Sequence, residues 1–397
     1  MNIAILTDRY FPTPVSGAVL MHDLALELVS QKHNVLVLTG DSQIKSNFEI
    51  REEDGTKILR VKVLDQKSLS LPRRLLFELF LQRKIWKIFK KELANQEIDL
   101  LIAHSPTIFW SFILKRIRQL KNPFIYLVLR DIFPKWAIDT KIISRINPVY
   151  WFLRWHEKML YGQVDVIGTQ SKSNQNYFLK SSFNKTFDTQ ILYNWKRIGS
   201  KSNINKNFRH KYDLKDKVIF VFGGNLGFAQ DIDNLLRLVS SFKNSEKIHF
   251  LFIGEGTEYK RIDLWIKEND IGSNLTLLPA VSNKEYQSIL QECDVGIISL
   301  RKDFKTDNFP NKILNYMEYK LPILASINPG NEIKEFINKH GNGLVSDNGE
   351  DEMLLNHAKE LLENELRRKE MGEKGYSMLE ETFNVKSAAN QIVKTKN

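Results

Sequence analysis

Short apolar runs alternate with helix-length amphipathic stretches along the whole chain. This alternation is typical of parallel β-sheets whose strands are joined by helices that cover the sheet. In the first half, the runs predicted to be strands are Ile3–Leu6, Asn34–Leu38, Ile58–Val63, Asp99–Ala103, Phe124–Leu129 and Val164–Gly168. In the second half they are Lys217–Phe222, His249–Ile253, Leu275–Leu278, Val295–Ser299 and Pro322–Ala325. Each half therefore has enough predicted strands for a complete α/β domain.

The stretch between the two sets of strands differs in composition. Residues 196–215 are rich in Lys, Ser and Asn and have few periodic apolar positions, which predicts a linker. The predicted organisation is an N-terminal domain over residues 1–195, this linker, a C-terminal domain over 216–375, and a last helix over 376–397 that returns to the first domain. Two similar α/β domains usually face a central cleft and bind ligands at the carboxyl ends of their strands. We therefore look for function in the loops that follow strands.

Length and composition narrow the class of protein. A chain of 397 residues predicts two or three domains, and an apolar share of 42% excludes intrinsic disorder. The single cysteine, Cys293, excludes a disulfide framework and a cysteine-rich metal site and favours a reducing compartment. The first residues read as a strand rather than a signal peptide, and no run of about 18 apolar residues is present. We expect a cytoplasmic protein that does not span a membrane.

The positive charge lies almost entirely in the first half. Residues 1–200 hold 30 Lys or Arg against 18 Asp or Glu, a net charge of +12. Residues 201–397 hold 28 against 29, a net charge of -1. The N-terminal half is therefore the part expected to meet an anionic surface or partner.

Residues 73–91 are the most basic stretch, with seven Lys or Arg against one acid. The apolar residues follow helical spacing, and the basic residues fall on roughly the opposite side. A basic amphipathic helix with Trp and Phe side chains is typical of a helix that lies on an anionic bilayer. The alternative is a core-facing helix with a basic solvated side. The predicted membrane contacts are Arg83, Lys84, Lys87, Lys90 and Lys91.

Candidate ligand-binding residues follow three predicted strands of the first half. Gly17 precedes a helix predicted over Val19–Ser30, where a glycine lets a phosphate or sugar oxygen approach backbone N–H groups. His104 and the pair Arg130–Asp131 follow two further strands and offer an imidazole, a guanidinium and a carboxylate to one edge of the sheet. The alternatives are a plain tight turn at Gly17 and a structural role for His104. The dinucleotide fingerprint G-x-G-x-x-G is absent from the first loop, which argues against a dehydrogenase.

Two glycine-containing loops follow strands of the second half. Gly224 and Asn225 lie in a loop with three glycines between a strand and a helix expected near Asp231. Gly254 and Gly256 follow the next strand. Such loops bring backbone N–H groups close to a pyrophosphate or a sugar, although one glycine-rich loop alone is a weak signal.

The stretch over residues 301–325 is the most informative. Its Asn-Phe-Pro-Asn segment at 308–311 favours a helix start, which places Lys312 in the first turn. A cation in the first turn of a helix interacts unfavourably with the helix dipole. We therefore expect Lys312 to bind an anion such as a diphosphate, which would compensate for this cost. Asn315 and Glu318 follow at intervals of three and share a face with Lys312. The alternative is the solvated face of a surface helix.

Together these motifs stand in the order found in glycosyltransferase family 4, which the chain resembles over nearly its whole length. The matching residues are Tyr10-Phe11-Pro12 with Gly17, His104-Ser105-Pro106, Arg130-Asp131 before Phe133-Pro134, Asn194-Trp195, Gly224-Asn225-Leu226-Gly227, Gly254-Glu255-Gly256, and Pro310-Asn311-Lys312 ahead of Leu321-Pro322. The resemblance implies the GT-B fold and a retaining hexosyltransferase that uses a nucleotide sugar. Among the relatives are bacterial enzymes of surface polysaccharide assembly, including lipopolysaccharide O-antigen and capsule.

The resemblance also implies roles for single residues. The predicted catalytic residues are His104 at the sugar, Asp131 near the acceptor and Lys312 at the diphosphate. The donor site would be lined by Gly17, Gly224, Asn225, Gly254, Gly256, Asn315 and Glu318. Many members carry two glutamates eight positions apart, and Asp307 and Asn315 occupy those positions here. A neutral amide bonds a ribose hydroxyl less strongly than a carboxylate does, and we favour Asn315 with Lys312 over Asp307.

Retention in this family is usually explained by departure of the leaving group and attack of the acceptor on the same face. Neither step demands a metal, and we expect no cofactor. The implied partners are a nucleotide-sugar donor, a lipid-linked oligosaccharide acceptor and the anionic inner face of a membrane. One alternative is a non-hydrolysing sugar-nucleotide epimerase of the same architecture, but the dense set of acidic and histidine residues expected of one is not apparent. The other is a nucleic-acid-binding module, for which no motif is found.

Overall fold

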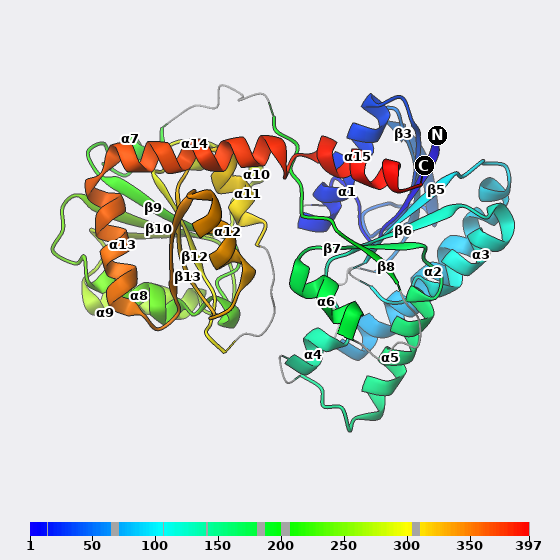
Figure 1. Cartoon of the computed structure of the whole chain (residues 1–397), viewed down its shortest axis with the longest axis horizontal. Helices are drawn as coiled ribbons and strands as arrows, with labels where there is room; N and C mark the ends of the chain where they lie inside the picture. The colour runs from blue at the N-terminus through cyan, green and yellow to red at the C-terminus, as the bar shows by residue number, and fades with distance from the viewer. Residues whose placement is uncertain are drawn as a thin grey trace. The chain divides into compact units, whose positions relative to one another are not determined.

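The computed structural model describes residues 1–13, 15–64, 71–105, 107–139, 142–180, 187–199, 207–303 and 310–396. The chain divides into two compact units (Figure 1). Unit 1 comprises Met1–Arg197 together with Val385–Asn397, and unit 2 comprises Ile198–Asn384. Each unit is built on its own β-sheet, as the alternation of apolar runs predicts.

Unit 1 holds an eight-stranded sheet in the order β3-β4-β2-β1-β5-β6-β7-β8. All neighbours are parallel except β3, which pairs antiparallel with β4. The strands are β1 (Asn2–Leu6), β2 (Asn34–Asp41), β3 (Phe48–Glu53), β4 (Thr56–Lys62), β5 (Leu100–Ser105), β6 (Phe124–Leu129), β7 (Val166–Thr169) and β8 (Asp188–Ile191). The six strands predicted for this half are confirmed, and the two edge strands β3 and β8 are additional.

Helices cover both faces of this sheet. They are α1 (Ser16–Ser30), α2 (Leu71–Ala94), α3 (Ser111–Lys121), α4 (Lys135–Asp139), α5 (Pro148–Tyr161), α6 (Lys172–Lys180) and α15 (Val385–Lys396). Alternate residues of β1 serve different cores: Ala4 and Leu6 pack with α2, α3 and α5, whereas Ile3 and Ile5 pack with α1 and α15. This alternation follows from the two-residue period of a strand buried on both faces.

The basic helix predicted over residues 73–91 lies within α2. Leu81, Ile85 and Phe89 are buried in the core of unit 1. The five predicted membrane-contact residues on the same helix, Arg83, Lys84, Lys87, Lys90 and Lys91, are exposed. The apolar stripe of α2 therefore packs on the sheet, as in the alternative of a core-facing helix, and does not face outward. The basic side of α2 remains accessible to a partner, together with Leu76 and Phe80 near the start of the helix, which are 54% and 56% exposed.

Unit 2 holds a six-stranded, fully parallel sheet in the order β11-β10-β9-β12-β13-β14. Its strands are β9 (Val218–Gly223), β10 (Ile248–Ile253), β11 (Leu275–Leu278), β12 (Val295–Ser299), β13 (Ile323–Ile327) and β14 (Gly343–Asp347). The helices are α7 (Phe208–Lys211), the 3-10 helix η2 (Phe228–Gln230), α8 (Ile232–Ser240), α9 (Tyr259–Asn269), α10 (Asn283–Leu290), α11 (Lys312–Glu318), α12 (Glu332–His340), α13 (Asp351–Glu363) and α14 (Glu365–Glu381). The five strands predicted here are confirmed, and β14 at one edge is additional.

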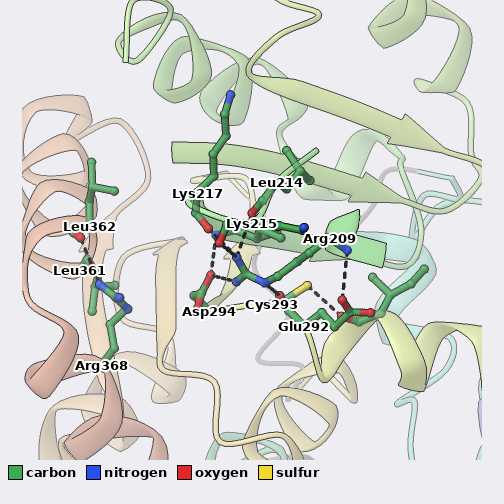
Figure 2. Close-up of polar contacts among 12 residues, drawn as sticks. Arg209, Leu214, Lys215, Lys217, Glu292, Cys293, Asp294, Leu361, Leu362 and Arg368 are labelled. Atoms are coloured by element: carbon green, nitrogen blue, oxygen red, sulfur yellow. Dashed lines mark hydrogen bonds and ion pairs between the residues drawn. The ribbon is translucent and has the colours of Figure 1, made fainter. Parts of the chain in front are cut away.

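Hydrogen bonds and an ion pair of Arg209 hold the first residues of unit 2 against its sheet (Figure 2). Its guanidinium donates to the carbonyl oxygens of Leu214 and Lys217 at 3.0 and 2.7 Å, and to the carboxylate of Asp294 at 2.5 Å. The carboxylate of Glu292 accepts from the backbone N–H groups of Phe208 and Arg209, the first residues of α7. Residues 207–215, predicted as linker, are therefore packed into unit 2, because a single arginine satisfies several of their backbone carbonyls.

Replacing Arg209 with Ala is expected to lower the free energy of unfolding by about 3 kcal/mol, because Asp294 and several carbonyls lose a charged donor at once. The matched control is Arg368→Ala. Arg368 donates to two carbonyls at the end of α13, at 2.6 and 3.1 Å, and forms no ion pair among the described residues (Figure 2). We expect the control to cost roughly 1 kcal/mol. Urea unfolding of the two variants and the wild type measures the difference, and equal losses would contradict this account.

The two last helices belong to different units. α14 packs within unit 2, whereas α15 lies against α1 in unit 1. The Val385 N–H donates to the Lys196 carbonyl at 3.0 Å, and Gln391 Nε2 donates to the Ile191 carbonyl at 2.9 Å. In the parts of the chain that the structure describes, no helix combines the length and apolar character needed to cross a bilayer.

Candidate functional site

In unit 2, strand order reverses between β9 and β12. The chain runs from β9 outward through β10 to β11, and then returns to β12 on the other side of β9. Ligands of open α/β sheets bind at such a reversal, outside the carboxyl ends of the strands. The residues around this position are those after β9, those after β10 and the first turn of α11.

The loops after β9 and β10 are packed backbone against backbone. The Gly224 N–H donates to Ile253 O, and the Leu226 N–H donates to Glu255 O, both at 2.9 Å. A Cβ added at Gly254 would lie 1.8 Å from Gly224 O, and one added at Gly256 would lie 2.2 Å from Leu226 O. The absent side chains of Gly254 and Gly256 thus make room for the first loop. Gly224, with φ of +113°, holds a backbone conformation that favours glycine.

Lys312, the first residue of α11, lies at this reversal beside Gly224. A Cβ built on Gly224 would be 3.8 Å from the Lys312 Nζ. The ammonium group lies 3.7 Å from the centre of the Phe222 ring, near the end of β9. Burial lowers the pKa of Lys312 to about 7, and no carboxylate of the described residues contributes to that shift. A desolvated ammonium group of this kind favours an anion that would compensate its charge.

Tyr316 explains why α11 presents Lys312 at this position. Its hydroxyl accepts from the Gly223 N–H at 3.2 Å and lies 3.3 and 3.2 Å from the carbonyl oxygens of Val221 and Ile297. Its ring fills the space left by Gly296, where a Cβ would lie 2.3 Å away. The helix is therefore tied to both β9 and β12, four residues after Lys312.

The remaining donor-site candidates of unit 2 lie in the loop after β9 and on α11. Asn315 is half-buried and Glu318 is buried on α11, at the spacing the sequence predicts. Asn225 is exposed and donates to Gln230 Oε1 at 3.3 Å. Asp307 lies outside the described residues.

In unit 1, the strand order reverses between β1 and β5, and His104 lies there. His104 and Ser105 are the last residues of β5 rather than part of the loop that follows it. The imidazole is buried and contacts Thr7, just after β1, at 3.1 Å. A Cβ added at Gly17, in the first turn of α1, would lie 2.8 Å from His104 Cε1. The structure thus brings Thr7, Gly17 and His104 together.

The hydrogen bonds assign the tautomer of His104. The Thr7 hydroxyl donates its proton to the Arg9 carbonyl at 2.9 Å, so it accepts from Nδ1–H of His104. This arrangement leaves Nε2 unprotonated and able to accept a hydrogen bond. Burial, together with the charge of Arg130, lowers the pKa of His104 to about 3. The ring is therefore neutral at physiological pH.

The neighbouring strand end carries Arg130 and Asp131 in different roles. The Arg130 guanidinium is buried, donates to the Leu192 carbonyl at 3.0 Å and lies 4.8 Å from the centre of the Trp195 ring. This contact holds the end of β6 to the segment after β8. The other two guanidinium nitrogens, Nε and Nη2, are buried without a hydrogen-bond partner among the described residues, so the expectation that Arg130 is offered to a ligand stays a prediction. Asp131 is exposed, two residues beyond β6.

Sequence reasoning missed three residues that shape these sites: Thr7, Phe222 and Tyr316. Each lies in or next to an apolar run and looks like a core residue in the sequence. Their contacts with His104, Lys312 and Gly223 join positions up to 97 residues apart. The glycines at 223–224 follow Phe222 directly, and the Pro310–Asn311 turn precedes the helix that carries Tyr316.

Two family descriptions match the chain, one in each unit. Residues 17–186 match Glycosyltransferase Family 4, and residues 204–378 match Glycosyl transferases group 1. The probable glycosyltransferase WbjE of Pseudomonas aeruginosa is 26% identical over 223 residues. That match spans about half of each protein, 55% of this chain and 54% of the relative.

Solved structures share the fold at low sequence identity. Sucrose-phosphate synthase from Thermosynechococcus elongatus superposes with a TM-score of 0.74 at 13% identity, covering 100% of this chain and 98% of that one. HepE of Anabaena in complex with UDP and glucose gives 0.69 at 16%, with coverages of 100% and 99%. WaaG, a glycosyltransferase involved in lipopolysaccharide biosynthesis, gives 0.64 at 11%, with coverages of 98% and 99%.

Two Rossmann-like parallel sheets, two glycosyltransferase family matches that together cover most of the chain, and structural neighbours of this architecture agree with one another. The chain is a glycosyltransferase of the GT-B fold, with a family 4 domain followed by a group 1 domain.

Proposed function

We propose that this enzyme moves a sugar from a nucleotide-sugar donor to a lipid-linked saccharide, with retention of the anomeric configuration, during surface polysaccharide synthesis. The observation that carries the donor assignment is Lys312, a desolvated cation at the strand reversal of unit 2. The UDP named with HepE supports a nucleotide in that role. WaaG, described as a glycosyltransferase involved in lipopolysaccharide biosynthesis, supports the polysaccharide assignment.

The donor diphosphate would contact Lys312 and the backbone of Gly224. Asn225 and the Gly254–Gly256 loop follow the carboxyl ends of β9 and β10. They would contact the rest of the diphosphate and the sugar. Asn315, one turn along α11, would bond a ribose hydroxyl, with Glu318 behind it. A diphosphate close to Lys312 raises the pKa of its ammonium group, so donor binding and protonation of Lys312 favour each other.

In unit 1, His104 would accept a hydrogen bond from a sugar hydroxyl through Nε2. Gly17 lies against the same ring and leaves the first N–H groups of α1 close to it. Asp131, exposed at the next strand end, would contact the acceptor. Its pKa of about 3 keeps His104 uncharged, so it would offer the sugar a hydrogen-bond acceptor and not a charge.

In the proposed reaction, the bond between the anomeric carbon and the diphosphate oxygen breaks while the acceptor hydroxyl attacks from the same face. The hydroxyl proton passes to the departing diphosphate, so atoms and charge balance without a covalent enzyme intermediate. Lys312 stabilises the negative charge that develops on the diphosphate, which is where electrostatic catalysis is most effective. The other residues position donor and acceptor.

The proposed acceptor implies a protein on the inner face of a membrane, in the cytoplasm. The exposed basic residues of α2 support contact with anionic lipid, since Arg83, Lys84, Lys87, Lys90 and Lys91 all face outward. Their contribution is electrostatic and would weaken as salt increases.

The direct test is a panel of sugar nucleotides, monitored by thermal shift and by release of the nucleoside diphosphate. We expect one or two members to raise the melting temperature by a few degrees at saturation, as a ligand that binds only the native state does. The matched controls are the free sugars at the same concentration, which lack the diphosphate and should leave the melting temperature unchanged. No shift with any member of the panel would contradict the donor assignment.

A further inference from the structure

Helix α5, labelled in Figure 1, carries exposed aromatic side chains. Trp151, Trp155 and Phe152 are 63%, 55% and 46% exposed. The inward side of the same helix is buried through Leu153, Leu160 and other residues. A surface helix normally turns polar residues outward, and three large exposed aromatics on one stripe mark an interaction site.

Apolar residues just before α5 and in its first turn extend the apolar surface. Ile146 is 91% exposed immediately before the helix, and Val149 in its first turn is also exposed. The Asn147 side chain accepts from the Val149 N–H at 2.9 Å and fixes the start of the helix. These residues therefore sit at a defined end of α5 next to Trp151.

The surface beside the aromatic stripe is basic. Ring contacts link Phe152 to Phe109 and to His156, with centroids 6.5 and 4.7 Å apart. Helix α3 packs against both α2 and α5, so cations carried by α2 and α3 lie near the aromatic stripe. Burial and, to a smaller extent, the charge of Arg83 on α2 lower the pKa of His156. The guanidinium groups of Arg83 and Arg116 both lie over the ring of Phe112, at 5.8 and 5.4 Å, so α2 and α3 contribute cations here.

The acidic residue of α5 does not balance these charges at the surface. Glu157 is fully buried and paired with Arg154, which also contacts Tyr177. The outward face thus combines exposed indole and phenyl rings with cations of α2 and α3. A second copy of the chain seated on this face would bring those cations against their own counterparts, which is unfavourable.

We propose that the outward face of α5, formed by Trp151, Phe152 and Trp155, inserts into the interfacial region of an anionic lipid bilayer. Indole rings are enriched at the boundary between headgroups and acyl chains, and neighbouring Lys and Arg attract anionic lipid. Leu81, Ile85 and Phe89 of α2 are buried, and Leu76 and Phe80 near its start are exposed, so α5 supplies the larger inserting surface and α2 mainly the charge. This inference rests on the proposed membrane-bound acceptor and names the element that reaches the membrane.

The test uses the full chain and vesicles of phosphatidylcholine with phosphatidylglycerol. We expect Trp151→Ser/Phe152→Ser/Trp155→Ser to weaken vesicle flotation by at least about tenfold. The matched control replaces three exposed apolar residues of unit 2, Leu264→Ser, Met353→Ser and Leu366→Ser, and should float like the wild type. Circular dichroism and the sugar-nucleotide thermal shift of both variants should be unchanged, so a loss of flotation is not a loss of folding.

A second readout reports insertion itself. Lipids brominated on the acyl chain should quench tryptophan fluorescence of the wild type, and Trp151→Phe/Trp155→Phe should keep most of the flotation while losing most of the quenching. Flotation that persists in the triple Ser variant, or flotation of the wild type without quenching, would overturn insertion by α5 while leaving contact through α2 intact. Concentration-dependent dimerisation that the triple variant abolishes would overturn it in favour of a second copy. Absence of flotation would remove the membrane contact altogether, and donor binding would still be tested separately by the thermal shift.

Discussion

Replacing Lys312 with Met is expected to make the protein more stable and unable to bind its donor. At pH 6 the native protein holds a desolvated ammonium group over Phe222, and Met keeps the length of the side chain without the charge. We expect the free energy of unfolding to rise by about 2 kcal/mol. Donor affinity should fall by at least about 100-fold, because the diphosphate loses its charged partner.

The stability gain should depend on pH in one direction. Below pH 7 Lys312 is protonated in both states, and the native state carries the full cost of desolvation. Between pH 7 and pH 10.5 the native lysine loses its proton while the unfolded lysine keeps it, so the wild type gains stability with rising pH. The difference between variant and wild type is therefore largest at pH 6 and smaller at pH 9.

Urea unfolding at the two pH values measures this difference. Lys260→Met is the matched control, because Lys260 is exposed on α9. It should change stability by no more than about 0.5 kcal/mol at either pH. A Lys312→Met variant that is no more stable at pH 6, or that binds the donor as the wild type does, would contradict the site.

Replacing His104 with Asn is expected to lower kcat/KM for nucleoside diphosphate release by about 100-fold while stability changes little. The Asn amide can still donate to Thr7 Oγ1, as Nδ1–H does at 3.1 Å. It offers no acceptor at the position of Nε2. The loss should therefore fall on the sugar contact and not on the fold.

His104→Gln is the paired variant. Its longer side chain places a carbonyl oxygen near the position of Nε2 and gives up the contact with Thr7. We expect it to retain more activity than His104→Asn and to be less stable. Because His104 has a pKa of about 3, neither the wild type nor the Gln variant should lose activity through this residue between pH 5 and pH 8. Equal activity of the Asn variant and the wild type would exclude the proposed contact.

The strands that could be predicted from the sequence are those buried on both faces. β5 and β9 are continuous apolar runs because helices cover them above and below. The three strands that were not predicted, β3, β8 and β14, are all at sheet edges. β3 reads Phe-Glu-Ile-Arg-Glu-Glu and is largely exposed, as charged edge strands often are. Apolar pattern alone does not distinguish such a strand from a loop.

Single residues of the candidate site could be predicted where residues typical of turns precede a helix. Pro310 and Asn311 identify the start of α11 and hence Lys312, which is its first residue. The ring beneath Lys312 could not be predicted, since Phe222 is one apolar residue among several in β9. The tautomer of His104 likewise depends on Thr7, on another strand.

Helices α2 and α5 show the same limit. α2 has a clear amphipathic pattern, yet its apolar side packs on the sheet. α5 is apolar on most sides in the sequence, so its exposed face could not be distinguished from its buried face. Only tertiary packing decides which apolar stripe remains outside.

The central claim is that the diphosphate of a nucleotide sugar lies between the loops after β9 and β10 and the first turn of α11. Hydrogen exchange of the full chain, with and without the sugar nucleotide selected from the panel, tests it most directly. We predict slower exchange at saturation in peptides covering residues 223–230, 253–258 and 310–318, with the peptides of β3 and β14 unchanged. Binding that leaves these three segments exchanging at the rate of the free protein would contradict the claim.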